Sequence, residues 1–346
     1  MARLPTVTDV AARAGVSPQT VSNVLNTPSV VRPRTRERVQ VAIDELQYRP
    51  HASARRLRTQ KSSTLGVRLE PVLDGIAGAV LDRFLHALTA QADAFGLRVL
   101  LYTAADPADE IDQFRRLLDG ADVDAFVLTA SFHDDPRTEW LIEHGCSFVT
   151  FGRPWGLDDL NEPRHLWVDV DGRAGTFDAT TYRLGQGDRR VGYLGWPSPS
   201  GTGDERDRGW REAMMAGSGL SSTEIDALHV VTSDGVDTGA AAMRELLAAP
   251  GVDAVVCASD SLALGATLAS AGRISVTGFD NTPVASSVGF SSVEQPLDEV
   301  AAGVLDLLTN PPDPADPSRT PDLRHRLFRP RLVTRDHPVG AAPADR

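Results

Sequence analysis

The start of the chain carries apolar residues at helical spacing between polar ones. The first such set predicts a helix and consists of Val7, Val10, Ala11 and Ala14. Thr6 stands where it can cap this helix, and the carboxylate of Asp9 is placed to reciprocate. Gly15 follows, at a position where a tight turn favours a residue without a Cβ.

A second helix is predicted directly after this turn. Ser17 can cap it, and Pro18 suits its first turn, where a missing N–H costs nothing. We expect its inward face to hold Val21, Val24 and Leu25. Its outward face is predicted to carry polar side chains, namely Gln19, Thr20, Ser22, Asn23 and Asn26.

A third helix is predicted over residues 35–46, with Val39, Ile43 and Leu46 on one face. Two short helices joined by a glycine turn are typical of a helix-turn-helix DNA-binding unit. Outward amides can hydrogen-bond base edges, and hydroxyls and arginines suit phosphates. The alternative is a small helical bundle with polar faces and no DNA role.

Charge separates this head from the rest of the chain. Residues 1–62 have 11 basic and four acidic side chains, a net charge of +7, whereas the remainder has a net charge of −19. A basic head on an acidic body indicates an anionic partner at the head alone. Together with the helix-turn-helix pattern, this charge predicts binding to double-stranded DNA.

Residues 51–58 form a short, basic, alanine-rich stretch after Pro50. Such a segment is too short to be a stable isolated helix, so we expect it to order only when docked on DNA and a second chain. Leu57 lies between arginines, which suits a wedge between base steps. The alternative is a plain linker.

From residue 63 onward, apolar runs alternate with helical patterns, which predicts parallel sheets covered on both faces. The predicted strands are 65–69, 98–102, 125–129, 147–151, 166–170, 191–195, 229–232, 254–258, 274–278 and 331–334. The predicted helices include 79–95, 111–118, 240–248 and 261–269. Ten strands exceed one typical sheet, so we expect two lobes with a ligand cleft between them.

Several classes of protein are excluded by what the sequence lacks. No apolar run of about 18 residues predicts a membrane span, and the N-terminus does not resemble a signal peptide. Cys146 and Cys257 are too few for a disulfide scaffold or a cysteine zinc site. No nucleophile elbow, P-loop or zinc-protease motif is present. We therefore expect a cytoplasmic protein that is not an enzyme and needs no metal or cofactor.

Some residues at predicted strand exits or at crossovers between the lobes are candidates for ligand binding. Arg206 can fork onto vicinal hydroxyls or a carboxylate, or it is a surface arginine paired with an adjacent acid. Asp280 can accept hydroxyl donors, or it caps a turn. Trp167 beside Asp169 suits a pyranose ring, or the tryptophan belongs to the core. The weaker candidates are Thr129, Ser131, Arg153 and Trp155.

The head resembles that of the lactose-repressor (LacI) family of bacterial regulators. The matching stretches are TVTDVA from Thr6, AGVS from Ala14 and TVSNVLN from Thr20. The resemblance implies that Pro18, Gln19 and Asn23 read bases in the major groove. It implies that the residues near phosphates are Thr6, Thr20, Ser22, Asn26 and Tyr48. It also implies that hinge helices pair in a dimer, with Leu57 in the minor groove and Ala54 facing the partner hinge.

For the body, the resemblance implies a fold akin to periplasmic sugar-binding proteins, with three chain crossings between lobes. It implies that Arg206 and Asp280 contact the effector and that Gln295 lies near the cleft. Two features depart from the family pattern. Gly152 stands where many relatives have Asp, so Arg153 or Asp169 is expected to supply that polar contact. The turn at residues 271–273 lacks residues that relatives carry.

The sequence thus predicts an all-α helix-turn-helix head, residues 1–50, a hinge and linker, 51–62, and an α/β effector-binding and dimerisation domain, 63–338. Within that domain, one lobe is predicted at 63–165 and 296–320, and the other at 166–295 and 321–338. Residues 339–346 are expected to be a disordered tail.

The predicted function is that of a homodimeric or larger repressor on a palindromic operator. Its DNA affinity is expected to be controlled by a mono- or disaccharide through closure or rotation of the lobes. The alternatives are a purine-like or other non-sugar corepressor, an activator, a sugar-binding protein, or an enzyme acting on sugars.

Overall fold

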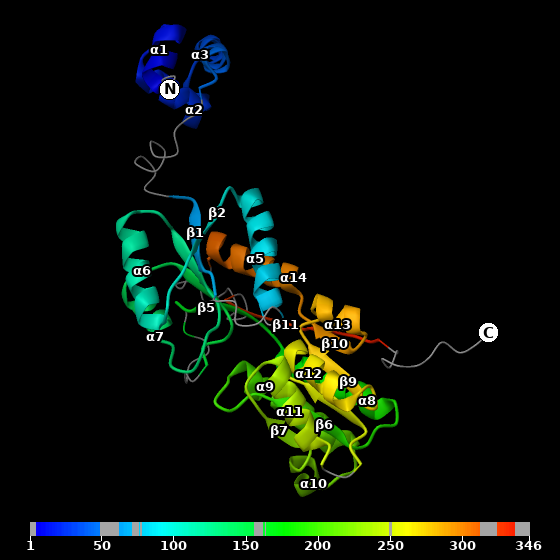
Figure 1. Ribbon diagram of the computed structural model, residues 1–346. Helices are drawn as coiled ribbons and strands as arrows, with labels where there is room; N and C mark the ends of the chain where they lie inside the picture. Colours follow the sequence, from blue (N-terminus) through cyan, green and yellow to red (C-terminus); the bar gives the residue numbers. More distant parts are fainter. Residues whose placement is uncertain are drawn as a thin grey trace, which may run out of the picture. The chain divides into compact units, whose positions relative to one another are not determined.

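The computed structural model contains a small helical unit and a larger α/β unit, drawn in Figure 1. These units are Met1–Ser62 and Ser63–Arg346, and each is described by itself. The residues that the structure describes are 5–48, 62–70, 76, 78–155, 162, 164–248, 251–311 and 324–335.

The helical unit begins as the capping pattern predicts. Its helices are α1 (Val7–Ala14), α2 (Pro18–Asn26), the 3-10 turn η1 (Pro28–Val30) and α3 (Pro33–Leu46). The backbone N–H of Thr6 donates to the Asp9 carboxylate at 2.7 Å, and the N–H of Asp9 donates to the Thr6 hydroxyl at 3.3 Å. Gly15 has a φ of 62°, and Ser17 caps α2 by accepting from the N–H of Thr20 at 3.2 Å. The predicted caps and turn are therefore confirmed.

A small apolar core joins these three helices. Val10, Val21 and Val39 are fully buried, one from each helix, and Tyr48 packs against the same cluster. Leu25 is 36% exposed, so its predicted inward placement is wrong. The apolar stripe of α2 is wider than the surface that α1 and α3 cover, which leaves Leu25 at its edge.

The larger unit is built on two six-stranded sheets, which define its two lobes. The first sheet has the order β11-β5-β4-β3-β1-β2, and all its neighbouring strands are parallel. Its strands are β1 (Thr64–Arg68), β2 (Arg98–Tyr102), β3 (Ala125–Leu128), β4 (Phe148–Phe151), β5 (Leu166–Val170) and β11 (His325–Phe328).

The second sheet has the order β12-β10-β9-β8-β6-β7. Only β12 runs antiparallel, against β10. Its strands are β6 (Val191–Gly195), β7 (His229–Val231), β8 (Ala254–Cys257), β9 (Ser275–Phe279), β10 (Ser291–Glu294) and β12 (Arg331–Val333). All ten predicted strands are present, while β10 and β11 were not predicted because both are short and rich in polar residues.

Helices cover both faces of the first sheet. Val127 points to one face, into a core with α5 (Gly78–Ala92) and α14 (Leu297–Thr309). Phe126 points to the other, into a core with α6 (Pro107–Asp119) and α7 (Pro136–Glu143). This alternation is what a parallel strand buried on both faces requires. The 3-10 turn η2 (Asp93–Phe95) follows α5.

The second lobe is packed in the same way. Its helices are α8 (Gly172–Gly185), α9 (Thr202–Gly217), α10 (Ser222–Asp226), α11 (Val236–Leu246), α12 (Asp260–Ser270) and α13 (Pro283–Val288). Trp210 of α9 is fully buried and stacks on Tyr193 of β6 at 5.3 Å.

The chain passes between the lobes after β5, after β10 and after β11, which gives the three predicted crossings. The lobe limits differ from the prediction, because β5 and β11 both pair within the first sheet. An apolar parallel strand carries no mark of the sheet it joins, so the sequence could not place the crossing before or after β5.

Candidate nucleic-acid interface and ligand cavity

The outer face of α2 carries the residues predicted to read bases. Pro18 and Gln19 are exposed, and the side-chain amide of Gln19 donates to Asn23 Oδ1 at 3.1 Å. Thr20 and Ser22 are half-buried beside them. This face presents amide and hydroxyl groups, which suit base edges and phosphates. The side chain of Asn26, together with Ala54 and Leu57, lies outside the described residues.

Two predicted phosphate contacts also have structural roles in the head. The hydroxyl of Thr6 is engaged with Asp9 in the cap of α1. Tyr48 is 8% exposed and belongs to the apolar core. Their contact with DNA stays a prediction.

Exposed arginines surround the start of α3. Arg32, Arg34 and Arg36 are exposed and form no ion pair with any described residue. Arg13, in contrast, pairs with Glu45 at 2.5 Å. The unpaired arginines give this part of the head a positive surface that attracts an anionic backbone.

A cavity of about 250 Å³ lies between the two lobes, at the carboxyl ends of their strands. Its polar lining consists of Thr129, Ser131, Asp169, Thr202, Arg206 and Gln295. Its larger apolar lining residues are Val80, Leu81, Phe151 and Val170. Five of the nine candidate effector residues therefore meet around one cavity.

Arg206 lies in the wall of this cavity and is 5% exposed. Its guanidinium lies 3.7 Å from the ring centre of Phe279, and its Nη2 is 3.7 Å from Asp280 Oδ1. Its Nη1 donates to the carbonyl of Ala258, while its Nε is buried without a hydrogen-bond partner among the described residues. Arg206 is therefore not a surface ion pair but a fixed cation with an unused donor.

Asp280 lies behind the cavity lining, between Arg206 and Gln295. The side-chain amide of Gln295 donates to Asp280 Oδ1 at 2.7 Å. Burial raises the pKa of Asp280 to about 7, although the charge of Arg206 opposes that shift. Its φ of 106° is unusual for a residue with a Cβ. A strained residue with a shifted pKa beside a cavity is typical of a functional site.

Arg153 connects the two lobes at the edge of the cavity. Its Nε donates to Asp169 in the first lobe at 2.7 Å, and its Nη1 donates to Glu205 of α9 in the second lobe at 3.4 Å. Its guanidinium also lies 4.7 Å from the ring centre of Trp155. A Cβ on Gly201 would lie 2.5 Å from that ring, so Trp155 packs directly on the second lobe.

Gly152 leaves room for Ser131. A Cβ at position 152 would lie 2.2 Å from the Ser131 hydroxyl, and the φ of 126° at Gly152 disfavours any side chain. The Ser131 hydroxyl donates to the carbonyl of Arg153 at 3.2 Å. Ser131 therefore occupies the space that a side chain at position 152 would need.

Trp167 is 7% exposed and is not among the residues that line the cavity. Its ring stacks on His325 of β11 at 4.8 Å and 13°. The structure thus places it in the packing between β5 and β11, as the core alternative expected. A contact between Trp167 and a sugar stays a prediction.

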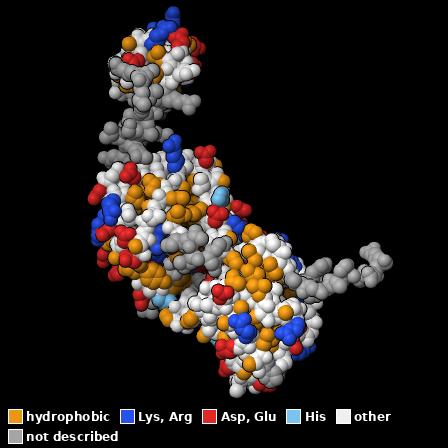
Figure 2. All heavy atoms as spheres, viewed as in Figure 1, with side chains coloured by type: hydrophobic (Ala, Val, Ile, Leu, Met, Phe, Trp, Pro, Cys, Tyr) orange, Lys and Arg blue, Asp and Glu red, His pale blue; other side chains and the backbone are white. Residues whose placement is uncertain are grey.

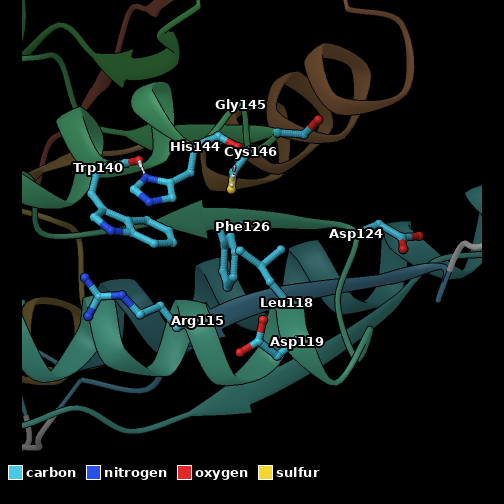
Figure 3. A pocket seen from close by; sticks show the side chains of 10 residues that line it. Arg115, Leu118, Asp119, Asp124, Phe126, Trp140, His144, Gly145 and Cys146 are labelled. Atoms are coloured by element: carbon cyan, nitrogen blue, oxygen red, sulfur yellow. Dashed lines mark hydrogen bonds between the residues drawn. The ribbon is translucent and has the colours of Figure 1, made fainter.

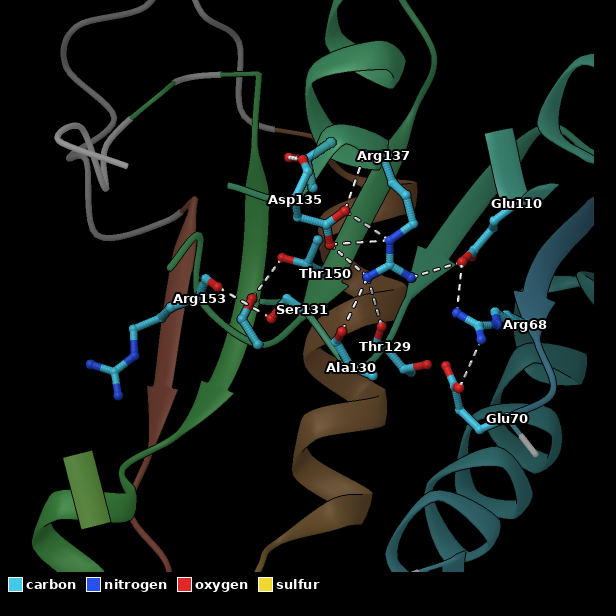
Figure 4. A network of polar contacts seen from close by, with 12 residues as sticks. Arg68, Glu70, Glu110, Thr129, Ala130, Ser131, Asp135, Arg137, Thr150 and Arg153 are labelled. Carbon is cyan, nitrogen blue, oxygen red and sulfur yellow. Dashed lines mark hydrogen bonds and ion pairs between the residues drawn. The ribbon is translucent and has the colours of Figure 1, made fainter. Parts of the chain in front are cut away.

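A buried ionic network beside the cavity was not predicted (Figure 4). Arg137 of α7 is 1% exposed and pairs with Asp135 at 2.6 Å and with Glu110 at 2.9 Å. It also donates to the carbonyls of Thr129 and Ala130, both at 3.2 Å, and so fixes the loop that forms one cavity wall. Asp135 and Arg137 stand at the start of α7, whereas Glu110 belongs to α6, and the sequence pattern gives no sign that the two helices bring these charges together.

The same network reaches the end of β1. Arg68 pairs with Glu110 at 3.1 Å and with Glu70 at 3.3 Å. Burial raises the pKa of Glu70; the charge of Arg68 opposes this shift, and the charge of Glu110 adds to it. A charged residue directly after a predicted strand was the available signal for Glu70.

A second cavity, of about 620 Å³, belongs to the first lobe alone (Figure 3). It lies between α6 and α7, with Phe126 and Cys146 in its lining. On one side of it, Trp140 stacks on His144 at 3.9 Å. This cavity has no wall from the second lobe.

Two kinds of feature are absent from the part of the chain that the structure describes. It contains no group of three or more potential metal ligands placed to hold an ion. It also contains no helix long and apolar enough to cross a membrane.

A helix-turn-helix head followed by a two-lobed α/β body with a polar cavity defines a class of DNA-binding regulators. The model of bacterial regulatory proteins of the lacI family matches residues 6–51. The model of periplasmic binding proteins and sugar binding domains of the LacI family matches residues 81–310. The chain belongs to the LacI family of bacterial transcriptional regulators.

Individual relatives cover most of the chain. The HTH-type transcriptional regulator CelR of Thermobifida fusca is 35% identical over 331 residues, which are 89% of this chain and 93% of CelR. GalS of Salmonella typhimurium is 30% identical over 288 residues, 81% of each chain. These relatives are transcriptional regulators and not enzymes.

Solved structures agree with the fold. A complex of the regulator CelR with cellobiose has a TM-score of 0.67 and 29% identity, and covers 97% of this chain and 100% of CelR. The lac repressor dimer bound to operator has a TM-score of 0.76 at 21% identity, with coverage of 98% and 100%. The predicted fold, an α-helical head with a two-lobed α/β body, is confirmed.

Proposed function

We propose that this regulator is a cytoplasmic, homodimeric repressor that binds a palindromic operator and releases it when a mono- or disaccharide fills the cavity between its lobes. The buried trio of Arg206, Asp280 and Gln295 carries this proposal. The guanidinium of Arg206 and the amide of Gln295 offer polar groups to sugar hydroxyls in the cavity wall, and the carboxylate of Asp280 lies directly behind both. The complex of its relative CelR with cellobiose supports a sugar as the ligand class.

Contacts between the lobes link the cavity to the shape of the body. Arg83 of α5 reaches across to the carbonyls of Asp280 and Asn281, both at 3.4 Å, and Arg153 reaches Glu205. A ligand beside these residues changes the relative stability of the lobe arrangements. It shifts operator affinity by its difference in affinity for the two states, for which about 1–3 kcal/mol is usual.

Exposed apolar side chains support a dimer. Leu101, on the edge strand β2, is 50% exposed, and Leu268 of α12 is 64% exposed. Figure 2 shows apolar side chains gathered in patches on both lobes. Apolar patches of this kind mark protein interfaces, and two-fold symmetry would place two heads on two half-sites.

The experiment uses full-length protein and an operator selected from a random duplex pool. Addition of the correct sugar from a mono- and disaccharide panel should weaken operator binding at least tenfold. Arg206→Ala should bind the operator but respond to no sugar. Arg211→Ala, which changes a half-buried arginine of the same helix outside the cavity lining, should respond like the wild type. Failure to select any duplex would contradict the proposed operator binding. An unchanged sugar response of Arg206→Ala would contradict the proposal that the sugar binds in the cavity between the lobes.

A further inference from the structure

The second lobe contains another cavity, of about 480 Å³, at the opposite ends of its strands. Ser275 and Ser291, the first residues of β9 and β10, line it, whereas Asp280 and Gln295 follow the other ends of the same strands. The length of the sheet therefore separates this cavity from the one between the lobes. It has no part in the function proposed above.

Among the residues that the structure describes, three arginines and no carboxylate line this cavity. They are Arg183, Arg273 and Arg335, and they lie in an otherwise acidic body with a net charge of −19 over residues 63–346. Most arginines of the described body pair with acids, as Arg137 and Arg153 do. Arginines clustered without acids in the cavity wall repel one another, and an anionic ligand bound between them would remove this repulsion.

The individual contacts leave positive charge uncompensated. Arg273 Nε donates to the carbonyl of Ser270 at 3.0 Å, and Arg335 donates to the carbonyl of Phe290 at 3.0 Å and to Asn281 Oδ1 at 2.6 Å. All three acceptors are neutral. Among the described residues, neither arginine forms an ion pair within 4 Å.

Two carboxylates outside the cavity lining, Asp188 and Asp260, lie close to these arginines. Arg183 is paired with Asp188 at 2.5 Å, yet its Nε is buried without a hydrogen-bond partner among the described residues. The charge of Arg335 partly offsets the burial that raises the pKa of Asp260. The Asp260 oxygens are, however, occupied by Thr282 and Ser292.

The short turn at residues 271–273 places one of these arginines. Ala271 ends α12 with a φ of 51°, and Gly272 follows with a φ of 71°. Two successive left-handed residues reverse the chain here, so Arg273 lies at the cavity wall two residues before the start of β9. A longer connection at this point would add residues between the helix end and the cavity.

We propose that this cavity binds a phosphate group, either inorganic phosphate or the phosphate ester of a small metabolite. Guanidinium groups bind tetrahedral oxyanions through several charge-assisted hydrogen bonds. The hydroxyls of Ser275 and Thr267 in the lining add neutral partners for the remaining oxygens or the ester group.

A bound phosphate is also connected to the ligand cavity through one side chain. Arg335 holds Asn281, which follows Asp280, and the carbonyl of Asn281 accepts from Arg83 of the other lobe at 3.4 Å. Recruitment of Arg335 by phosphate would weaken its hold on Asn281. This coupling, unlike the binding itself, rests on the proposed sugar-responsive function, and it would change sugar affinity in the presence of phosphate.

The test measures binding to full-length protein by titration calorimetry, with inorganic phosphate and glucose 6-phosphate as probes. Wild type should show saturable binding of at least one probe, and Arg273→Gln should weaken it at least tenfold. Arg244→Gln removes the same charge from an exposed position of α11 outside the cavity and should bind like the wild type. Tighter binding of glucose 6-phosphate identifies an ester as the ligand, and equal binding identifies phosphate alone.

Two results would overturn the proposal. One is the absence of saturable binding of either probe to wild type, and the other is equal weakening by Arg273→Gln and Arg244→Gln. Arg206→Ala separates the two cavities, because it should keep phosphate binding while losing the sugar response. Loss of glucose 6-phosphate binding in Arg206→Ala, with retention in Arg273→Gln, would assign the ester to the cavity between the lobes instead.

Discussion

Gln295 donates a hydrogen bond of 2.7 Å to Asp280, and this contact joins a crossing segment between the lobes to the end of β9. The amide stabilises the carboxylate and lowers its pKa, whereas burial raises that pKa more strongly. The balance places the titration of Asp280 near neutral pH. A small change in the polarity of the cavity therefore changes the ionised fraction of Asp280, which lies beside Arg206.

The stability of the body should depend on pH through Asp280. Its pKa is about 7 in the folded protein against 3.8 for an ordinary aspartate, so the folded state binds the proton more tightly. The stabilisation that proton binding by Asp280 gives the folded state is fully present below about pH 4. It falls as pH rises towards 7 and is lost above pH 7. The change is on the order of 1–4 kcal/mol. Urea unfolding at intervals from pH 4.5 to 8 should show this fall in wild type relative to Asp280→Asn, and parallel curves would contradict it.

The outward amides of α2 should determine which duplex the head prefers. Asn23→Ala removes the acceptor of the Gln19 amide and a candidate base contact, and should cost about 1–3 kcal/mol of operator binding. Gln40→Ala breaks a similar amide contact, with Asp44 on α3, and should leave binding unchanged. Fluorescence anisotropy with operator and scrambled duplexes measures both. Equal affinity of wild type and Asn23→Ala for the operator would contradict base recognition at this position.

The close crossing of α8 and α9 depends on Gly209. A Cβ there would lie 2.0 Å from the carbonyl oxygen of Arg173 and 2.4 Å from the Thr176 hydroxyl, so Gly209→Ala should destabilise the body by at least ~1–3 kcal/mol. Gly185, in α8, has open space around its Cα, and Gly185→Ala should stabilise by about 0.5–1 kcal/mol. Opposite shifts in melting temperature are expected, and shifts of the same sign would be inconsistent with this packing.

Replacement of Arg137 should destabilise the lobe whose loop it holds in the wall of the cavity between the lobes. Arg137→Met leaves Asp135 and Glu110 buried without their main cation and should cost about 3–5 kcal/mol. Arg115→Met breaks an exposed ion pair with Asp112 on α6 and should cost under ~1 kcal/mol. Chemical denaturation compares the two variants. Similar losses in both would mean that the network contributes no more than a surface pair.

The sequence was most informative where local geometry alone decides the structure. The capping pair of Thr6 and Asp9, the turn at Gly15 and the ten apolar strands follow from spacing and side-chain chemistry over a few residues. The site was predictable where a polar residue directly follows a strand or begins a helix near one. Arg206 and Asp280 were found in this way, whereas Asp169 lies within β5 and was chosen because it stands beside Trp167.

Features that depend on distant contacts could not be predicted from the sequence. The position of Trp167 against His325 follows from the pairing of β5 with β11, across more than 150 residues of chain. The network around Arg137 combines side chains from three elements, each of which is unremarkable by itself. The space beside Gly152 is filled by Ser131, and the sequence pattern of neither segment shows that these two residues meet.

The strands β11 and β12 lie at the end of the chain, and each completes one sheet. The head, in contrast, draws its core from residues 10–48 alone. During synthesis the head can therefore fold first, while both sheets wait for residues 325–333 to leave the ribosome. A chain truncated before residue 325 would therefore keep the complete core of the head but lack one strand of each sheet of the body.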